Sequence, residues 1–169
     1  MRIAKVFTLS ILLAFPGRLL AQSHEGHAPA HDDSAFRAMQ GRGGAVMGVD
    51  QYTSIHRFDA LPDGGRIELQ RDRDDSAGTA AIRTHMRTIA LAFARGDFTA
   101  PAMVHLETVP GVPVMRTRRD SIRYESIDLP RGAALRIRTR DAAAITAVHE
   151  FLAYQRREHR TTGAAPHAH

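Results

Sequence analysis

Cysteine is absent from the 169-residue chain, and this absence excludes several classes of protein. Without thiols, disulfide bonds cannot hold the fold, and neither a cysteine nucleophile nor a lipid-bearing N-terminal cysteine is available. Aromatic residues are also scarce, at 6% of the chain. Because bases stack on aromatic platforms, an arginine-bearing surface that lacks them is not expected to bind nucleic acid. The fold must therefore rest on its hydrophobic core.

Long hydrophobic runs are missing as well, apart from one near the N-terminus. Arg2 and Lys5 precede the apolar segment 6–15, and Ala21 follows as the small residue expected before a cleavage site. This pattern predicts a signal peptide over residues 1–21. The run is shorter than the ~20 residues that a membrane span needs, so we expect a periplasmic or secreted protein with no membrane anchor after cleavage. Cleavage would also lower the formal net charge from +5 to +2, which again disfavours nucleic acid as a partner.

The rest of the chain divides by composition. Residues 22–46 are rich in glycine, alanine, histidine and aspartate and show no sustained period, which predicts a flexible His-rich leader. Residues 47–160 are predicted to form a single α+β domain. Residues 161–169 are expected to be a disordered tail.

The domain pattern consists of two similar halves. The first has a strand pattern over 47–59, a turn at 61–65, a second strand and an amphipathic helix that ends at Gly96. The second repeats this order from 121 onward, and Asp141 caps its helix. We therefore expect two strand-strand-helix units that form one four-stranded antiparallel sheet with both helices on one face, an α+β fold. The connection 97–119 is expected to be loop with at most a short helical turn, and the arginine-bearing face of the sheet is expected to be exposed to water.

A loose resemblance extends over residues 47–160. It is carried by Met47-Gly48, Asp50-Gln51, Met103, His105 and His149-Glu150-Phe151-Leu152. Through these residues the chain resembles a group of small exported bacterial proteins. The resemblance carries over no activity and no site residue.

Histidine and methionine lie near the predicted apolar faces more often than packing requires. Neutral imidazole binds copper, zinc and nickel, and a thioether adds affinity for Cu(I). The candidate metal ligands of the domain are His56, His85, His105, His149, Met86 and Met103, and Met115 also suits copper. In the alternative interpretation these are separate structural histidines, each hydrogen-bonded in or near the core.

The predicted leader carries three further candidate metal ligands, His24, His27 and His31. Cleavage after Ala21 would place His24 third from a free amine. The amine, two deprotonated amides and that imidazole form a square-planar site that selects Cu(II) or Ni(II). A polar tether that happens to contain histidine is the alternative.

The sequence supports three functional hypotheses. The first is an exported protein that binds copper or a similar transition metal (zinc or nickel) for sequestration or delivery. The alternative is a small periplasmic domain that binds a protein partner or a small ligand and whose histidines are structural. The third is a metal-assisted hydrolase, because Asp97 and Glu107 lie close in sequence to His105. We favour the first and expect no catalytic residues.

Overall fold

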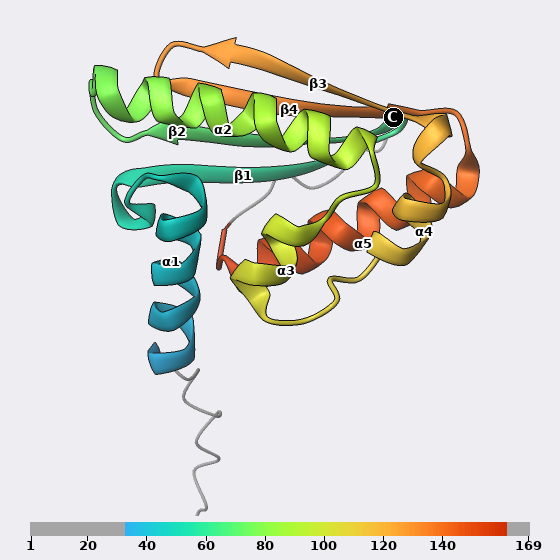
Figure 1. Cartoon of the computed structure of the whole chain (residues 1–169), viewed down its shortest axis with the longest axis horizontal. Helices are drawn as coiled ribbons and strands as arrows, with labels where there is room; N and C mark the ends of the chain where they lie inside the picture. The colour runs from blue at the N-terminus through green and yellow to red at the C-terminus, as the bar shows by residue number, and fades with distance from the viewer. Residues whose placement is uncertain (1–32, 162–169) are drawn as a thin grey trace, which may run out of the picture. The chain divides into compact units, whose positions relative to one another are not determined.

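The computed structural model describes residues 33–161 (Figure 1). The predicted signal peptide, His24, His27, His31 and nearly all of the predicted tail lie outside these residues. The elements in chain order are α1 (Asp33–Met47), η1 (Gln51–Thr53), β1 (Ser54–Leu61), β2 (Gly64–Arg71), α2 (Ser76–Ala94), α3 (Thr99–His105), α4 (Val112–Thr117), η2 (Arg119–Ser121), β3 (Ile122–Leu129), β4 (Gly132–Thr139) and α5 (Ala142–Glu158).

The four strands form one antiparallel sheet in the order β1-β2-β4-β3. Each predicted half supplies one hairpin, and the two hairpins join where β2 pairs with β4. Helix α2 packs on β3 and β4, whereas α5 packs mainly on β1 and β2 (Figure 1). Both helices cover the same face, because Phe93 of α2 contacts both Tyr124 of β3 and Phe151 of α5. The predicted α+β fold is confirmed.

Aspartate caps the start of both long helices, α2 and α5, as predicted for Asp141. The Asp75 carboxylate accepts a hydrogen bond from the Gly78 backbone N–H at 2.9 Å, and Asp141 accepts one from Ala144 at 3.0 Å. Such caps satisfy amide groups that have no partner within the first turn. Gly96 has a φ of +78°, which lets the chain leave α2 at little steric cost.

The expected loop at 97–119 is instead largely helical. Pro101 and Val104 of α3, and Val112 and Met115 of α4, are buried. Two short helices therefore add to the core where proline and glycine had predicted loop with at most a short helical turn. The prolines are compatible with these helices because each lies in or near the first turn, where its missing N–H costs nothing.

The predicted flexible leader is also wrong for its last part, because residues 33–46 belong to α1. Glycines at 41, 43 and 44 lower the helix propensity of this segment. Packing compensates: the Arg42 side chain donates a hydrogen bond to the Val104 carbonyl at 2.7 Å, and the Arg160 guanidinium lies 4.2 Å from the Phe36 ring centroid. Tertiary contacts thus stabilise a helix that local sequence does not favour.

The opposite face of the sheet is charged, as predicted. The strand register places Arg57, Arg66, Arg123, Arg136 and Arg138 on the face away from Phe58 and Leu135. Acidic neighbours pair with several of them, for example Glu125 with Arg138 at 2.8 Å. Within residues 33–161, no helix combines the length and apolar character that crossing a bilayer demands.

Candidate functional site

A partly open pocket lies between the helix-covered face of the sheet and helices α1, α2, α3 and α5. Its cavity volume is about 90 Å³. Most of its wall is apolar and includes Phe58, Leu69, Phe93, Leu135 and Phe151. In the part of the chain that the structure describes, the polar side chains of this wall are His56, His85, His105, Gln155 and His159, and no carboxylate, lysine or arginine lines it.

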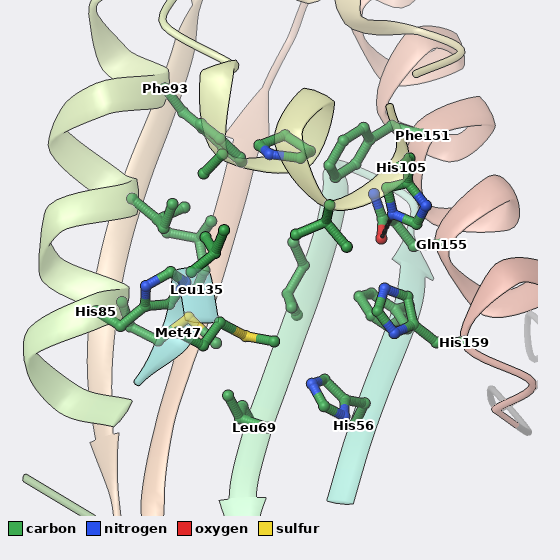
Figure 2. A pocket seen from close by; sticks show the side chains of 18 residues that line it. Met47, His56, Leu69, His85, Phe93, His105, Leu135, Phe151, Gln155 and His159 are labelled. Atoms are coloured by element: carbon green, nitrogen blue, oxygen red, sulfur yellow. Dashed lines mark hydrogen bonds between the residues drawn. The ribbon is translucent and has the colours of Figure 1, made fainter. Parts of the chain in front are cut away.

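Four different elements bring these histidines together. His56 lies on β1 and points to the same side as Phe58, two residues further along the strand. His85 is on α2, His105 is the last residue of α3, and His159 follows the last residue of α5. In Figure 2 the rings of His105, His159 and His56 form a column on one side of the pocket, and His85 lies across from them.

His159 is the centre of this column. Its ring centroid lies 5.4 Å from that of His56, with nearly parallel planes, and 5.3 Å from that of His105, with perpendicular planes. Phe58 also contacts His159, at 5.5 Å between ring centroids. We call His56, His105 and His159 the histidine column.

Two ring nitrogens of the column are buried without a hydrogen-bond partner among residues 33–161, namely Nε2 of His56 and Nδ1 of His159. Buried polar atoms are rarely left unpaired, because each one costs about 1–3 kcal/mol. His105 differs, since its Nε2 lies 3.1 Å from Oε1 of Gln155. An amide oxygen only accepts, so this contact places the His105 proton on Nε2 and leaves Nδ1 as the acceptor.

Burial keeps the pocket histidines neutral. It lowers the pKa of His56 to about 4, with a smaller contribution from His85. It lowers the pKa of His159 to about 3, helped by His56 and His105. The pKa of His85 is lowered by burial, and burial also lowers that of His105 although Gln155 and two glutamates oppose it. All four rings are therefore predominantly neutral at pH 7, with a proton on one nitrogen and a lone pair on the other.

The structure brings together three of the four predicted core histidines. His149 does not line the pocket, because its Nε2 lies 2.9 Å from the Leu61 carbonyl oxygen at the rim of the sheet. Met103, a second predicted ligand, does not line the pocket either, because its side chain lies at the surface and is 55% exposed. Met115 is fully buried but away from the pocket, whereas Met86 and Met47 line it.

The carboxylates of Asp97 and Glu107, the two acids near His105 in sequence, accept hydrogen bonds from other residues. Asp97 accepts a hydrogen bond from the Thr99 backbone at 2.9 Å, and Glu107 accepts one from the Tyr154 hydroxyl. Over the described range 33–161, no group of three or more His, Cys, Asp or Glu side chains is arranged so that it could hold a metal ion.

Sequence reasoning missed His159 and Gln155, although a signal was present. The apolar stripe that the sequence predicts for α5 comprises Ile145, Val148 and Leu152. Continued at the same helical period, it reaches Gln155 and His159, the eleventh residue after Val148. His149, one residue out of step with this stripe, falls at its edge.

Comparison of the chain with known protein families, with curated proteins and with solved structures finds no match. The functional argument therefore depends on the pocket alone.

Proposed function

We propose that this protein binds a transition metal ion in the histidine pocket and acts in its sequestration or delivery. The observation that carries the proposal is the histidine column, in which one buried imidazole, His159, lies between the partly buried imidazoles of His56 and His105 in one pocket. Copper, zinc and nickel are the candidate ions, because imidazole suits each of them. Action outside the cytoplasm follows from the predicted signal peptide.

The spacing of the column supports this proposal. Two imidazoles that share one ion through bonds of about 2.0–2.1 Å have ring centroids roughly 5 to 5.5 Å apart. The distances from His159 to His56 and to His105 are 5.4 and 5.3 Å. The two pairs that include His159 therefore already have a suitable separation, whereas His56 and His105 lie on either side of His159 and would have to approach each other to share an ion with it.

Ring orientation must change for binding, and the cost of that change is small. The final side-chain torsion of histidine has a broad energy minimum, so the rings can turn towards a common point. Nε2 of His56 and Nδ1 of His159 have no hydrogen-bond partner among the described residues. Turning either ring therefore breaks no hydrogen bond at that nitrogen. A bound ion would supply those nitrogens with the partner that the described structure does not give them.

Gln155 supports the same role for His105. Histidines that bind metal commonly donate their other ring N–H to a carbonyl or carboxylate, which fixes the tautomer and the ring plane. The Gln155 side-chain oxygen is placed to accept from Nε2 of His105, so Nδ1 is the nitrogen available to an ion. Because His105 is already neutral, no proton has to leave before an ion binds.

A thermal-shift titration tests the proposal. The protein background is the full chain with the five histidines outside the described residues replaced by alanine: His24, His27, His31, His167 and His169. Added copper, zinc or nickel should raise the melting temperature, since a ligand at a hundred times its Kd adds about 2.7 kcal/mol to stability. No rise with any of the three ions would contradict the proposal.

Two further variants separate the column from a non-specific effect. His159→Phe keeps a ring against Phe58 but removes both nitrogens, so it should abolish the metal-dependent rise. His149→Ala is the matched control, because His149 lies outside the pocket, and it should retain the rise. Circular dichroism confirms that both variants are folded.

The apolar wall favours a second candidate, a small and mainly hydrophobic ligand. Pockets for such ligands are largely apolar with a few polar groups that orient the ligand, and this one has that composition. The neutral rings of His56 and His159 would then accept or donate hydrogen bonds. A melting temperature that is raised by small neutral aromatics and unaffected by metal ions would favour this candidate.

A further inference from the structure

We propose that the pocket binds a small neutral phenol, with its ring against the apolar wall and its hydroxyl hydrogen-bonded to ring nitrogens of His56 and His159. The inference rests on the second candidate function, a pocket for a small hydrophobic ligand, and does not require a metal ion. It uses the neutrality of the described wall, the aromatic rings that line it, and the two buried nitrogens that lack partners.

The wall selects against charged ligands. Among residues 33–161 its polar side chains are histidine and glutamine, and the four imidazoles are neutral at pH 7. An ion that enters apolar surroundings loses its hydration, and its burial is unfavourable unless an opposite charge compensates. The lining side chains supply no such charge. A carboxylate or an ammonium group on the ligand would therefore oppose binding, whereas an uncharged ligand meets no such cost.

Aromatic rings surround the pocket. Phe58 of β1, Phe93 of α2 and Phe151 of α5 line it together with the four imidazoles. Phe93 and Phe151 meet edge to face, with ring centroids 6.1 Å apart. A flat aromatic ligand can add further edge-to-face or offset contacts, which stabilise ring pairs beyond the apolar area that they bury. The lining therefore favours an aromatic ligand over an aliphatic one of equal size.

The volume of the pocket limits the ligand to a single ring. A closed cavity of ~150 Å³ lined by aliphatic and aromatic side chains holds benzene. This pocket measures about 90 Å³, but it is partly open, and Met47 and Met86 line it. Because methionine is unbranched and flexible, these side chains can move aside for a ring. A ligand with two fused rings would require a larger rearrangement of the core.

A hydroxyl group matches the two nitrogens that lack partners. Nε2 of His56 and Nδ1 of His159 are buried with no hydrogen bond to any described residue, so they do not bond to each other. His159 is only 8% exposed, and in Figure 2 the His56 ring extends from its strand into the pocket. A neutral imidazole nitrogen either donates or accepts, and a hydroxyl can do both. A small turn of either ring about its final torsion, which has a broad energy minimum, lets its nitrogen reach the hydroxyl.

An NMR titration of the metal-free full chain tests the inference with four ligands of similar size: phenol, toluene, benzoate and benzylammonium. Phenol and toluene differ by a hydroxyl in place of a methyl group. In a wholly apolar pocket toluene would bind more tightly, since a hydroxyl that leaves water without a new partner loses free energy. We expect the reverse, with phenol bound roughly fivefold more tightly than toluene. Benzoate and benzylammonium should show no detectable binding.

His56→Phe tests the contact with the hydroxyl. The substitution keeps a ring stacked on Phe58 but removes both nitrogens. It should weaken phenol binding by roughly fivefold, as expected for one lost hydrogen bond, and should not weaken toluene binding. His149→Ala is the matched control and should change neither, because His149 lies outside the pocket. The side-chain nitrogen shifts of His56 and His159 supply a second readout, since phenol should move them more than toluene does.

The outcomes separate the inference from the candidate function on which it rests. Toluene binding at least as tight as that of phenol, or an unchanged phenol affinity in His56→Phe, overturns the phenol inference but leaves a pocket for apolar ligands. Benzoate binding as tight as that of phenol also overturns it, because a neutral wall would then not select against charge. If none of the four ligands binds, both the inference and the second candidate function are wrong.

Discussion

His56 and His159 connect protein stability to pH. Their pKa values in the folded protein are about 4 and about 3, whereas a histidine in the unfolded chain has a pKa of ~6.5. Between these values the unfolded chain binds more protons than the folded one, so the free energy of unfolding should fall as pH decreases from 6.5 towards 4. Each of the two groups contributes up to roughly 1.4 kcal/mol per pH unit in this window. Full stability is expected above pH 6.5.

Urea unfolding of metal-free protein at several pH values between 7.5 and 4.5 measures this slope. The aspartates with lowered pKa values, such as Asp75 and Asp141, lose their contribution only below about pH 4, so they do not obscure it. His159→Phe should make the slope shallower, and His149→Ala serves as the control. An unfolding free energy that stays constant over this range would show that the histidines are not buried as described.

Two glycines should respond to the same substitution in opposite ways. Gly111, with a φ of +80°, precedes α4, and a Cβ atom there would lie 2.0 Å from the Ala147 carbonyl oxygen. The positive φ alone would cost an alanine ~1–3 kcal/mol of backbone strain. The clash with the Ala147 carbonyl adds to this, so Gly111→Ala should lower the free energy of unfolding by more than that amount. Gly41 lies within α1 with no atom close to its Cβ position, so Gly41→Ala should stabilise by about 0.5–1 kcal/mol. Thermal denaturation measures both, and a tolerated Gly111→Ala would contradict the close approach of α4 to α5.

At the scale of elements, regular patterns were predictable and context-dependent helices were not. The four strands alternate inward and outward residues, and α2 and α5 carry a continuous stripe and an aspartate cap, so local sequence determines each of them. Helices α1 and α3 lack such patterns. They form because they pack on one another, as the contact between Arg42 and Val104 shows. That packing cannot be predicted from the local sequence.

The pocket residues could likewise be predicted only where they lie on elements with a regular sequence pattern. His56 and His85 were assigned to apolar faces from strand and helix periods, and the structure places both at the pocket. His105 depended on α3, whose position only tertiary packing determines. His159 was missed because the α5 stripe was followed only as far as Leu152, and Met47 because it had been placed at a domain boundary.

Helix α1 should open more readily than the rest of the described fold. Met39, Gln40 and Gly43 are its buried residues, whereas α5 buries seven. Elements with few buried contacts open locally at a lower free energy than the core. Hydrogen exchange should therefore be faster in α1 than in α5.

Arg42→Ala should accelerate exchange in α1 by roughly fivefold, equivalent to about 1 kcal/mol for the lost hydrogen bond. Arg37→Ala, an exposed position on the same helix, is the matched control. Exchange in α5 should stay unchanged in both variants. Equal effects of the two substitutions would show that the contact with Val104 does not hold α1 in place.

At the scale of the whole molecule, the two strand-strand-helix units depend on each other. They meet through the antiparallel pairing of β2 with β4, and Phe93 of the first unit contacts Phe151 of the second. A two-stranded hairpin is at most marginally stable alone, and each unit by itself would lose the apolar contacts that it makes with the other. The full chain should therefore unfold in one cooperative transition, whereas fragments 33–97 and 98–161 should each lack a cooperative melting transition by circular dichroism. A cooperative melt from either fragment alone would contradict this interdependence.

The uneven exposure of the methionines has a consequence for oxidative chemistry. Met103 is 55% exposed, whereas Met86 and Met115 are 4% and 0% exposed. Peroxide converts accessible thioethers to sulfoxides first, and a sulfoxide is polar and poorly suited to an apolar environment. Mild peroxide treatment followed by peptide mass spectrometry should thus show Met103 oxidised well before Met86 and Met115. Oxidant would modify the surface of α3 while the thioether of Met86, in the pocket wall, stays reduced.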